Sequence, residues 1–402
     1  IVLCFAACGK TDGDKSSTGK AANVKVGFIF LHDENSTYDK NFITAAEEAC
    51  KKAGVEILKK TNISETQACY DAAAELVDEG CNVIFADSFG HEPYVIQAAK
   101  KFPEVQFLHA TGTKAHTEGL SNYHNAFASI YEGRYLAGVA AGMKLNEMIS
   151  SGKITADKAK MGYVGAYTYA EVISGYTSFY LGAKSVCPSV TMEVTFTGSW
   201  YDETAEKEAA QKLINNGCVL ISQHADSMGA PTACEAAGVP NVSYNGSTVS
   251  ACPNTFIVSS RIDWAPYLEY AIDCVKNGKA IDTDWTGTLS TGSVVLTDVN
   301  TKAAAEGTQA KIDEVKAELE SGKLHVFDTS AFTVTVSDSK NKNATVDADG
   351  HLTGYKADID SDADNTGDTE VVSDGYFHES EKRSAPCFDV QIDGITLLDT
   401  KF

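Results

Sequence analysis

Apolar runs alternate with amphipathic segments along most of the chain. Residues 24–30 read VKVGFIF, a continuous apolar run that is typical of a strand buried on both faces of a sheet. Further on, Phe42, Ala46 and Ala49 are spaced as on one face of a helix. The polar segment 31–39 separates the two. The pattern predicts a strand–loop–helix unit whose loop lies at the carboxyl end of a parallel strand, where open α/β sheets bind ligands.

The same unit recurs in two series. Strands are predicted at 55–60, 83–86 and 105–110 with helices between them, and a short extended segment at 120–123 precedes a long helix at 129–148. A second series of strands and helices runs from 161 to 277. The repetition predicts two doubly wound α/β lobes with parallel sheets and right-handed crossovers.

The pattern of apolar and polar residues changes from residue 324 onward. Apolar and polar residues alternate there, and Asp349-Gly350 is a turn signal. We therefore expect a small, acidic, β-rich C-terminal extension that packs on the second lobe.

The first residues, IVLCFAACGK, resemble the end of a secretory signal peptide followed by a bacterial lipobox. Residues 1–7 are then the remnant of the signal, Cys8 is the lipidated residue, and 8–23 form a polar, flexible tether. This order predicts an extracytoplasmic protein that a lipid anchors to the cell membrane. The alternative is an accidental apolar start to a fragment.

The composition of the chain argues against some classes of function. The net charge of -22 argues against nucleic-acid binding, which needs basic patches. The chain has no apolar run long enough for a transmembrane helix. Without Cys4 and Cys8, nine of the 11 cysteines remain, mostly in apolar segments. Buried free cysteines are the expectation, although an extracytoplasmic location would permit a disulfide or two.

Motifs for nucleotide cofactors and for metals are weak. The chain lacks G-x-G-x-x-G, a phosphate-binding loop and a G-x-S-x-G elbow, so we expect no cofactor and no catalytic residue. Asp358, Asp360, Asp362 and Asp364 alternate along one segment, but a calcium-binding loop would also need Gly and Glu at fixed positions. A solvated acidic loop is the preferred interpretation, with calcium as the alternative, and no metal site is assigned.

The predicted strand ends carry aromatic side chains together with short polar ones. A planar ligand could stack between rings from two lobes while amides and carboxylates contact its edge. The alternative for Trp200 and Tyr201 is that they only cap a sheet. The candidate ligand-binding residues are Asp33, Tyr38, Asn41, Phe42, Ser88, Phe89, Trp200, Tyr201, His224, Asp226, Asn245, Asp263 and Trp264.

Several of these segments carry a family resemblance. The segments NFITAAEEA, VIFADSFG, NAFASIYEGRYLAGVAAG, TFTGSWYD, SQHADSMGA and RIDWAPYLEYA together resemble the basic membrane protein (BMP) family of solute-binding lipoproteins, over residues 24–299. The resemblance implies a periplasmic-binding-protein fold of type I, an ABC importer with its permease as partner, and a purine nucleobase or nucleoside as ligand.

The resemblance also implies roles for single residues. Tyr38 and Phe42 lie where the family has its first-lobe stacking aromatic, and Trp200 matches the opposing one. Ser88, His224, Asp226, Asn245 and Asp263 fall on loops that contact the base or the sugar. Nucleoside-binding members carry an acidic residue and a lysine for the ribose near positions 245 and 262, and neither is present here. Asp263-Trp264 instead resembles an adenine-specific branch, so base and nucleoside both stay open.

With this fold, the first lobe is expected at 24–125 and 262–284, the second at 126–261 and 285–325, and the extension at 326–402. The chain would cross between the lobes near 121–127, 259–263 and 282–288, which are the expected hinges. We expect a monomer that binds its ligand between the lobes and delivers it to the permease. The alternatives are a sensory ectodomain and a nucleoside hydrolase or phosphorylase, for which the carboxylates of Asp33 and Asp226 are the support.

Overall fold

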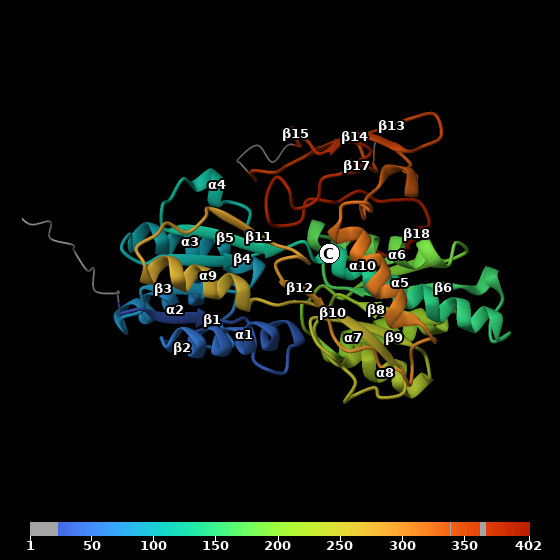
Figure 1. Ribbon diagram of the computed structural model, residues 1–402, viewed down its shortest axis with the longest axis horizontal. Coiled ribbons are helices and arrows are strands. Elements are labelled where there is room, and N and C mark those ends of the chain that lie inside the picture. Colours follow the sequence, from blue (N-terminus) through green and yellow to red (C-terminus); the bar gives the residue numbers. More distant parts are fainter. Residues whose placement is uncertain (1–22, 338, 362–366) are drawn as a thin grey trace, which may run out of the picture.

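The computed structural model describes residues 23–337, 339–361 and 367–402. They form two α/β lobes that lie side by side and a C-terminal extension that packs mainly on the second lobe (Figure 1). The predicted signal remnant, the lipidation at Cys8 and nearly all of the tether lie outside the described residues, as do Asp362 and Asp364 of the acidic segment.

The first sheet has six strands, and every neighbouring pair in it is parallel. Their order across the sheet is β2 (Glu56–Lys60), β1 (Lys25–Ile29), β3 (Val83–Ala86), β4 (Gln106–Ala110), β5 (Tyr123–Ala128) and β11 (Asp284–Gly287). The helices of this lobe are α1 (Thr37–Ala53), α2 (Gln67–Asp78), α3 (Glu92–Lys101), α4 (Ala115–Glu118) and α9 (Ala265–Lys276), with the 3₁₀ turn η1 (Phe89–His91). Strands buried on both faces explain the continuous apolar runs of the sequence.

The second sheet has seven strands, of which only β12 runs antiparallel to its neighbour. The order is β12 (Val294–Leu296), β10 (Phe256–Ile262), β9 (Asn241–Tyr244), β8 (Leu220–Gln223), β6 (Lys160–Gly165), β7 (Thr191–Phe196) and β18 (Ile395–Leu397). Its helices are α5 (Ile130–Ser150), α6 (Ala170–Val186), α7 (Glu203–Asn215), α8 (Gly229–Ala237) and α10 (Thr308–Glu320), with η2 (Ala156–Lys158). The predicted fold class of two doubly wound parallel-sheet lobes is confirmed.

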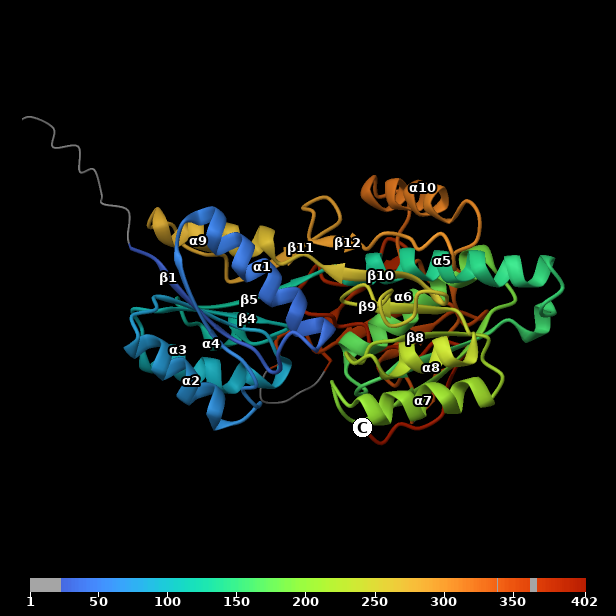
Figure 2. The same ribbon diagram turned by 90° about the horizontal axis from the view of Figure 1, so that it is seen from below.

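The chain passes between the two sheets three times, as the two ribbon views show (Figures 1 and 2). It leaves the first sheet at Ser129 between β5 and α5, returns between β10 and α9, and leaves again between β11 and β12. The strand β5 lies further along the chain than the extended segment 120–123 that the sequence indicated, and the two share only Tyr123. Its apolar pattern is broken by His124 and Asn125, which are buried and bond to Asp282 and Ala115 respectively.

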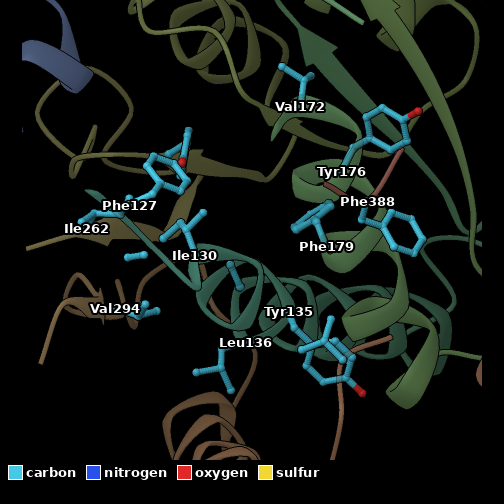
Figure 3. Packing of buried hydrophobic residues seen from close by; sticks show 14 of the residues in the cluster. Phe127, Ile130, Tyr135, Leu136, Val172, Tyr176, Phe179, Ile262, Val294 and Phe388 are labelled. Atoms are coloured by element: carbon cyan, nitrogen blue, oxygen red, sulfur yellow. The ribbon is translucent and has the colours of Figure 1, made fainter. Parts of the chain in front are cut away.

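The helices α5 and α6 pack closely, and glycines of both helices lie at their crossing. A Cβ atom on Gly138 would lie 2.0 Å from the carbonyl oxygen of Phe179, and one on Gly182 would lie 2.0 Å from that of Tyr135. Figure 3 shows Tyr135 and Leu136 of α5 and Tyr176 and Phe179 of α6 in the surrounding core. These glycines therefore allow the two helix backbones to approach closely.

The extension combines small sheets with one strand of the second lobe. Its strands β13 (Ala344–Val346), β14 (Leu352–Ala357) and β15 (Thr369–Glu370) form one antiparallel sheet, β16 (Val372–Ser373) and β17 (Tyr376–Phe377) form another, and η3 (Thr329–Ala331) precedes them. The last strand, β18, pairs in parallel with β7 and so joins the second lobe. Phe388 stacks on Phe327 at 4.1 Å and belongs to the core shown in Figure 3.

The extension also touches the first lobe. The amide of Ser384 donates to Asp284 Oδ2 at 2.7 Å, and the hydroxyl of Thr286 donates to the carbonyl of Ser380 at 3.4 Å. Both partners in the first lobe belong to β11, so the extension bridges the two lobes next to one of the crossing segments.

All nine cysteines of the described residues are buried and free, in agreement with the sequence interpretation. Within the same residues, no helix combines the length and the apolar character that a membrane span requires.

Replacing Gly138 by Ala should destabilise the protein strongly, although alanine is the better helix former. The new methyl group meets backbone atoms of α6, so the helices must separate, and we expect a loss of about 2–4 kcal/mol in the free energy of unfolding, measured with urea. Gly133→Ala is the matched control, because its Cβ meets mainly side-chain carbons of Val294 and Ser260 that can adjust. Equal losses in both variants would contradict this account of the crossing.

Candidate functional site

A cavity lies between the lobes, and its empty space, including space open to solvent, is about 370 Å³. Its walls come from loops and first helical turns that follow the carboxyl ends of strands in both sheets, as expected for open α/β sheets. The lining residues are Leu31, His32, Tyr38, Asp39, Ser88, Phe89, Thr111, Glu171, Trp200, His224, Asp226, Tyr244 and Asn245.

The first-lobe wall is fixed by hydrogen bonds at the start of α1. Ser36 is the N-cap residue, and its hydroxyl accepts from the amide of Asp39 at 3.2 Å. The hydroxyl of Tyr38 donates to the carbonyl of Asp87 at 2.7 Å, which fixes the ring at the cavity. Asp39 Oδ1 accepts from the amide of His32 at 2.8 Å. Burial alone would raise the pKa of Asp39, but hydrogen bonds from His32 and Ser36 bring it below its ordinary value.

The second-lobe wall has a carboxyl group, that of Asp226, whose pKa is shifted in the opposite direction from that of Asp39. Asp226 is buried, and desolvation raises its pKa well above the ordinary range, with further contributions from the charges of Asp39 and Glu206. Burial therefore favours the protonated form of the group, which presents one donor beside one acceptor. The side-chain amide of Asn245 donates to Asp226 Oδ1 at 3.2 Å. Asn245 has a φ of 65°, a conformation that asparagine tolerates better than most residues.

The two lobes touch across the cavity. The amide of Thr37, at the start of α1, donates to the carbonyl of Asp226 at 3.1 Å, and the Thr37 hydroxyl donates to the same oxygen at 3.2 Å. A helix N-terminus has free amides and a positive dipole end, so a carbonyl oxygen is a favourable partner. Outside this contact, the rings of Phe89 and Tyr169 lie 5.2 Å apart between the lobes.

Behind the second-lobe wall lies a buried arginine. Arg134 of α5 is fully buried, and its Nη2 donates to the hydroxyl of Tyr163 at 2.9 Å. That hydroxyl lies 3.3 Å from His224 Nδ1, and His224 Nε2 lies 3.4 Å from Glu171 Oε1. Desolvation lowers the pKa of His224, so the ring is neutral. The bonds are satisfied when each group donates to the next, from Arg134 through Tyr163 and His224 to Glu171.

Seven of the thirteen residues expected at the site line the cavity, three from the first lobe and four from the second. They are Tyr38, Ser88, Phe89, Trp200, His224, Asp226 and Asn245. The carboxyl end of a strand or the turn after it positions each of them.

The other six lie elsewhere. Phe42 and Trp264 are each 1% exposed and stack on one another at 4.3 Å in the core of the first lobe. Asn41 bonds to the carbonyl of Ile262 in the crossing segment, and Asp263 Oδ1 accepts from the amide of Ala265, the first residue of α9, at 3.0 Å.

The remaining two, Asp33 and Tyr201, lie outside the cavity lining. Asp33 Oδ1 accepts from the amide of Asn35 at 3.0 Å in a surface turn. The ring of Tyr201 lies 5.4 Å from that of His32. Because Asp33 does not line the cavity, the structure does not bring it together with Asp226 there, as the enzyme alternative would need.

Sequence reasoning did not select Asp39 and Glu171, although both line the cavity. Each lies in the first turn of a helix, where an acidic residue is normal because of the helix dipole. The loop between β6 and α6 received no candidate at all, and the strand-end rule applied to it would have found Glu171. Thr111 also lines the cavity, with a φ of 64° that is unusual for a β-branched residue.

The lining combines rings, hydroxyls, amides and carboxyl groups, and the hydroxyl of Ser88 donates to Glu65 Oε1 at 2.6 Å. Among the described residues, no group of three or more His, Cys, Asp or Glu side chains is arranged to hold a metal ion. The calcium alternative for the acidic segment concerns Asp362 and Asp364 as well, which lie outside that part of the chain.

Two parallel α/β lobes with a cavity between them are the architecture of the solute-binding proteins of ABC transporters. A solute-binding protein of an ABC transporter system from Conexibacter woesei DSM 14684 shares this fold, with a TM-score of 0.60 and 21% identity over 75% of this chain and 98% of that chain. The chain belongs to the Bmp family, because the model of the PnrA-like ABC transporter substrate-binding proteins matches residues 27–324. The family that the sequence segments resembled is thereby confirmed.

Two relatives extend the comparison. A purine-binding protein of Brucella abortus (strain 2308) is 30% identical over 310 residues, which are 76% of this chain and 83% of the relative. A putative ABC transporter glucose-binding protein of Haloferax volcanii is 27% identical over 332 residues, 80% of this chain and 78% of the relative. The two relatives are thus named for ligands of two different chemical classes.

Glu206 should make the stability of the protein depend on pH. Its buried carboxylate accepts from the amide of Ser227 at 3.1 Å, and burial raises its pKa to about 7. Between the ordinary pKa of 4.5 and about 7, only the folded state keeps the proton. The free energy of unfolding contributed by this group therefore falls as pH rises through that window, by at most about 3 kcal/mol.

Glu206→Gln should remove this part of the pH dependence. Between pH 5 and pH 7.5, we expect the free energy of unfolding of the wild type to fall relative to that of the variant. Urea unfolding at each pH measures both values. Glu208→Gln, on the exposed side of the same helix, is the control. Parallel pH profiles for the wild type and Glu206→Gln would refute the assignment.

Proposed function

We propose that this protein is the purine receptor of an ABC importer and that it binds a nucleobase or nucleoside in the cavity between its lobes. One observation carries the proposal: aromatic rings approach the cavity from both lobes, Tyr38 from the first and Trp200 from the second. Apolar ring faces on two sides suit a flat aromatic ligand. The purine-binding relative from Brucella abortus supports the same ligand class.

The polar groups of the cavity suit the edge of a purine. A protonated Asp226 offers a donor and an acceptor side by side. A purine presents a ring nitrogen next to an N–H group, so the nitrogen can accept from the carboxyl O–H while the N–H donates to the carboxyl oxygen. The first lobe adds Asp39, which hydrogen bonds keep ionised and which therefore attracts N–H donors. A pyranose ring would also find hydroxyl partners here, so the glucose-binding relative makes hexoses the rival ligands to test.

The transport cycle follows from this placement of the ligand. The three segments that cross between the sheets are the proposed hinges, and the ligand holds the lobes together by contacting both. Lipid attachment at Cys8 on the outer face of the cell membrane would keep the receptor, a monomer, next to its permease. No bond of the ligand is made or broken in this scheme.

Trp200→Ala should abolish the stabilisation by purines. Adenine, hypoxanthine and their nucleosides should raise the melting temperature of the wild type by mass action, and loss of the ring should cost about 2 kcal/mol of binding free energy. Tyr201→Ala, which removes a neighbouring ring outside the cavity lining, is the control. Thermal shifts with hexoses and none with purines would overturn the ligand class. A large loss of stability without ligand would instead favour the sheet-capping interpretation of Trp200.

The protonation of Asp226 can be tested by two substitutions. Asp226→Asn keeps a donor beside an acceptor and should retain purine affinity within about threefold, whereas Asp226→Ala should lose about tenfold or more, by isothermal titration calorimetry. Asp33→Asn, at the surface turn, is the control for loss of a charge. Equal losses in the Asn and Ala variants would mean that the site needs an ionised carboxylate.

A further inference from the structure

A second cavity, here called the annex cavity, adjoins the one between the lobes. Its empty volume is about 1090 Å³, including space open to solvent. Phe89, Thr111 and Glu171 line both cavities, so the two meet at these side chains. The outer wall is formed by the extension, with Tyr355, Lys356, Asp358, Arg383 and Asp389. These residues lie beyond position 324, where the family match ends.

Glu171 lies at the junction of the two cavities and is held as a hydrogen-bond acceptor. His224 Nε2 lies 3.4 Å from its Oε1, at the end of the series that starts at Arg134. Oε2 accepts no hydrogen bond from another described residue, and the side chain keeps 12% of its exposure. A carboxylate with one free oxygen accepts readily from hydroxyl groups, and neighbouring hydroxyls of a sugar are suitable donors.

The charges of the annex cavity suit a neutral substituent and disfavour a phosphate. Arg383 donates to the carbonyls of Ala385, Asp358, Ile359 and Pro386 at 2.9–3.1 Å, so its guanidinium is already occupied. Lys356 is the other cation of the described lining. The carboxylates of Glu171 and Asp358 balance the charges of Lys356 and Arg383, so the described lining offers an incoming phosphate no net positive charge.

Burial disfavours the ionised form of Asp389, the third carboxyl group of the lining. Asp389 accepts from the hydroxyl of Tyr355, and desolvation raises its pKa. The cavity is thus rich in hydroxyl and carboxyl partners but holds few free charges, which matches a hydroxylated, uncharged group.

We propose that the annex cavity is a second subsite, in which the hydroxyl-bearing substituent of a purine nucleoside binds with Glu171 as an acceptor at the junction. The inference rests on the proposed purine site in the first cavity. It assigns the selection of nucleosides over nucleotides to the C-terminal extension, outside the region shared with the family.

The test fills the annex cavity without touching the first one. Ala170 lines only the annex cavity, and Ala170→Phe should narrow it. By calorimetry on the intact protein, we expect adenosine or inosine to bind at least about tenfold more weakly to this variant, while adenine and hypoxanthine keep their affinity within about twofold. Ala205→Phe, also a half-buried alanine in the first turn of a helix of this lobe, is the matched control and should change neither.

Two further measurements keep the test informative if Ala170→Phe folds poorly. Glu171→Gln should weaken nucleoside binding more than base binding, because the amide is a poorer acceptor than the carboxylate. The wild type should bind the 5′-monophosphate at least about tenfold more weakly than the nucleoside.

The outcomes separate this inference from the proposed function. Unchanged nucleoside affinity in Ala170→Phe, equal losses for base and nucleoside, an equal loss in Ala205→Phe, or monophosphate binding as tight as that of the nucleoside would each overturn the annex subsite. So would a wild type that binds bases alone. In all these cases the purine site itself stands. If the wild type binds neither bases nor nucleosides, the proposed function fails.

Discussion

The second lobe is organised around the buried charge of Arg134. A fully buried cation is costly unless its surroundings replace the water it has lost. Here the guanidinium donates to Tyr163, Ser222 and the carbonyl of Ser243 and lies 5.0–5.3 Å from three ring centroids, whereas no carboxylate among the described residues pairs with it. The acceptors and rings come from β6, β8, β9 and α6, so these elements must meet at fixed distances. The ligand-facing side of the lobe, with Tyr244 and His224, rests on this arrangement.

The buried position of Arg134 also explains why α5 and α6 carry glycines where they cross. Arg134 reaches the strands only if α5 lies close to the sheet and α6 lies close to α5, and the backbone contact at Gly138 and Gly182 makes that approach possible. The contact between the lobes is far weaker. It consists of polar contacts such as that of Thr37 with the carbonyl of Asp226, and of a few rings. Because Asp226 lines the cavity while its carbonyl contacts the other lobe, ligand binding and lobe closure in the proposed cycle would act on one residue.

Sequence alone could predict the fold because buried parallel strands leave continuous apolar runs, and the turns that follow them indicated part of the cavity lining. It could not separate Tyr38 from Phe42. Both are aromatic and one helical turn apart in α1, yet Tyr38 reaches the cavity and Phe42 packs against Trp264 in the core. Only the position of α9 decides between them. The strand β18 could not be predicted from the sequence either. It has only three residues, which show no clear hydrophobic period, and it pairs with β7, which lies about two hundred positions earlier in the sequence.

In the proposed transport cycle, the extension would resist the opening of the lobes. Its strand β18 is part of the second sheet, so the extension moves with the second lobe. Its contacts with the first lobe include the hydrogen bonds of Ser384 with Asp284 and of Ser380 with Thr286. Separation of the lobes at this edge must stretch or break them, and each is worth about 0.5–1.5 kcal/mol, or more where the acceptor is charged. A few kcal/mol favour the closed arrangement without preventing opening, because a ligand that contacts both lobes can supply a differential affinity of the same size.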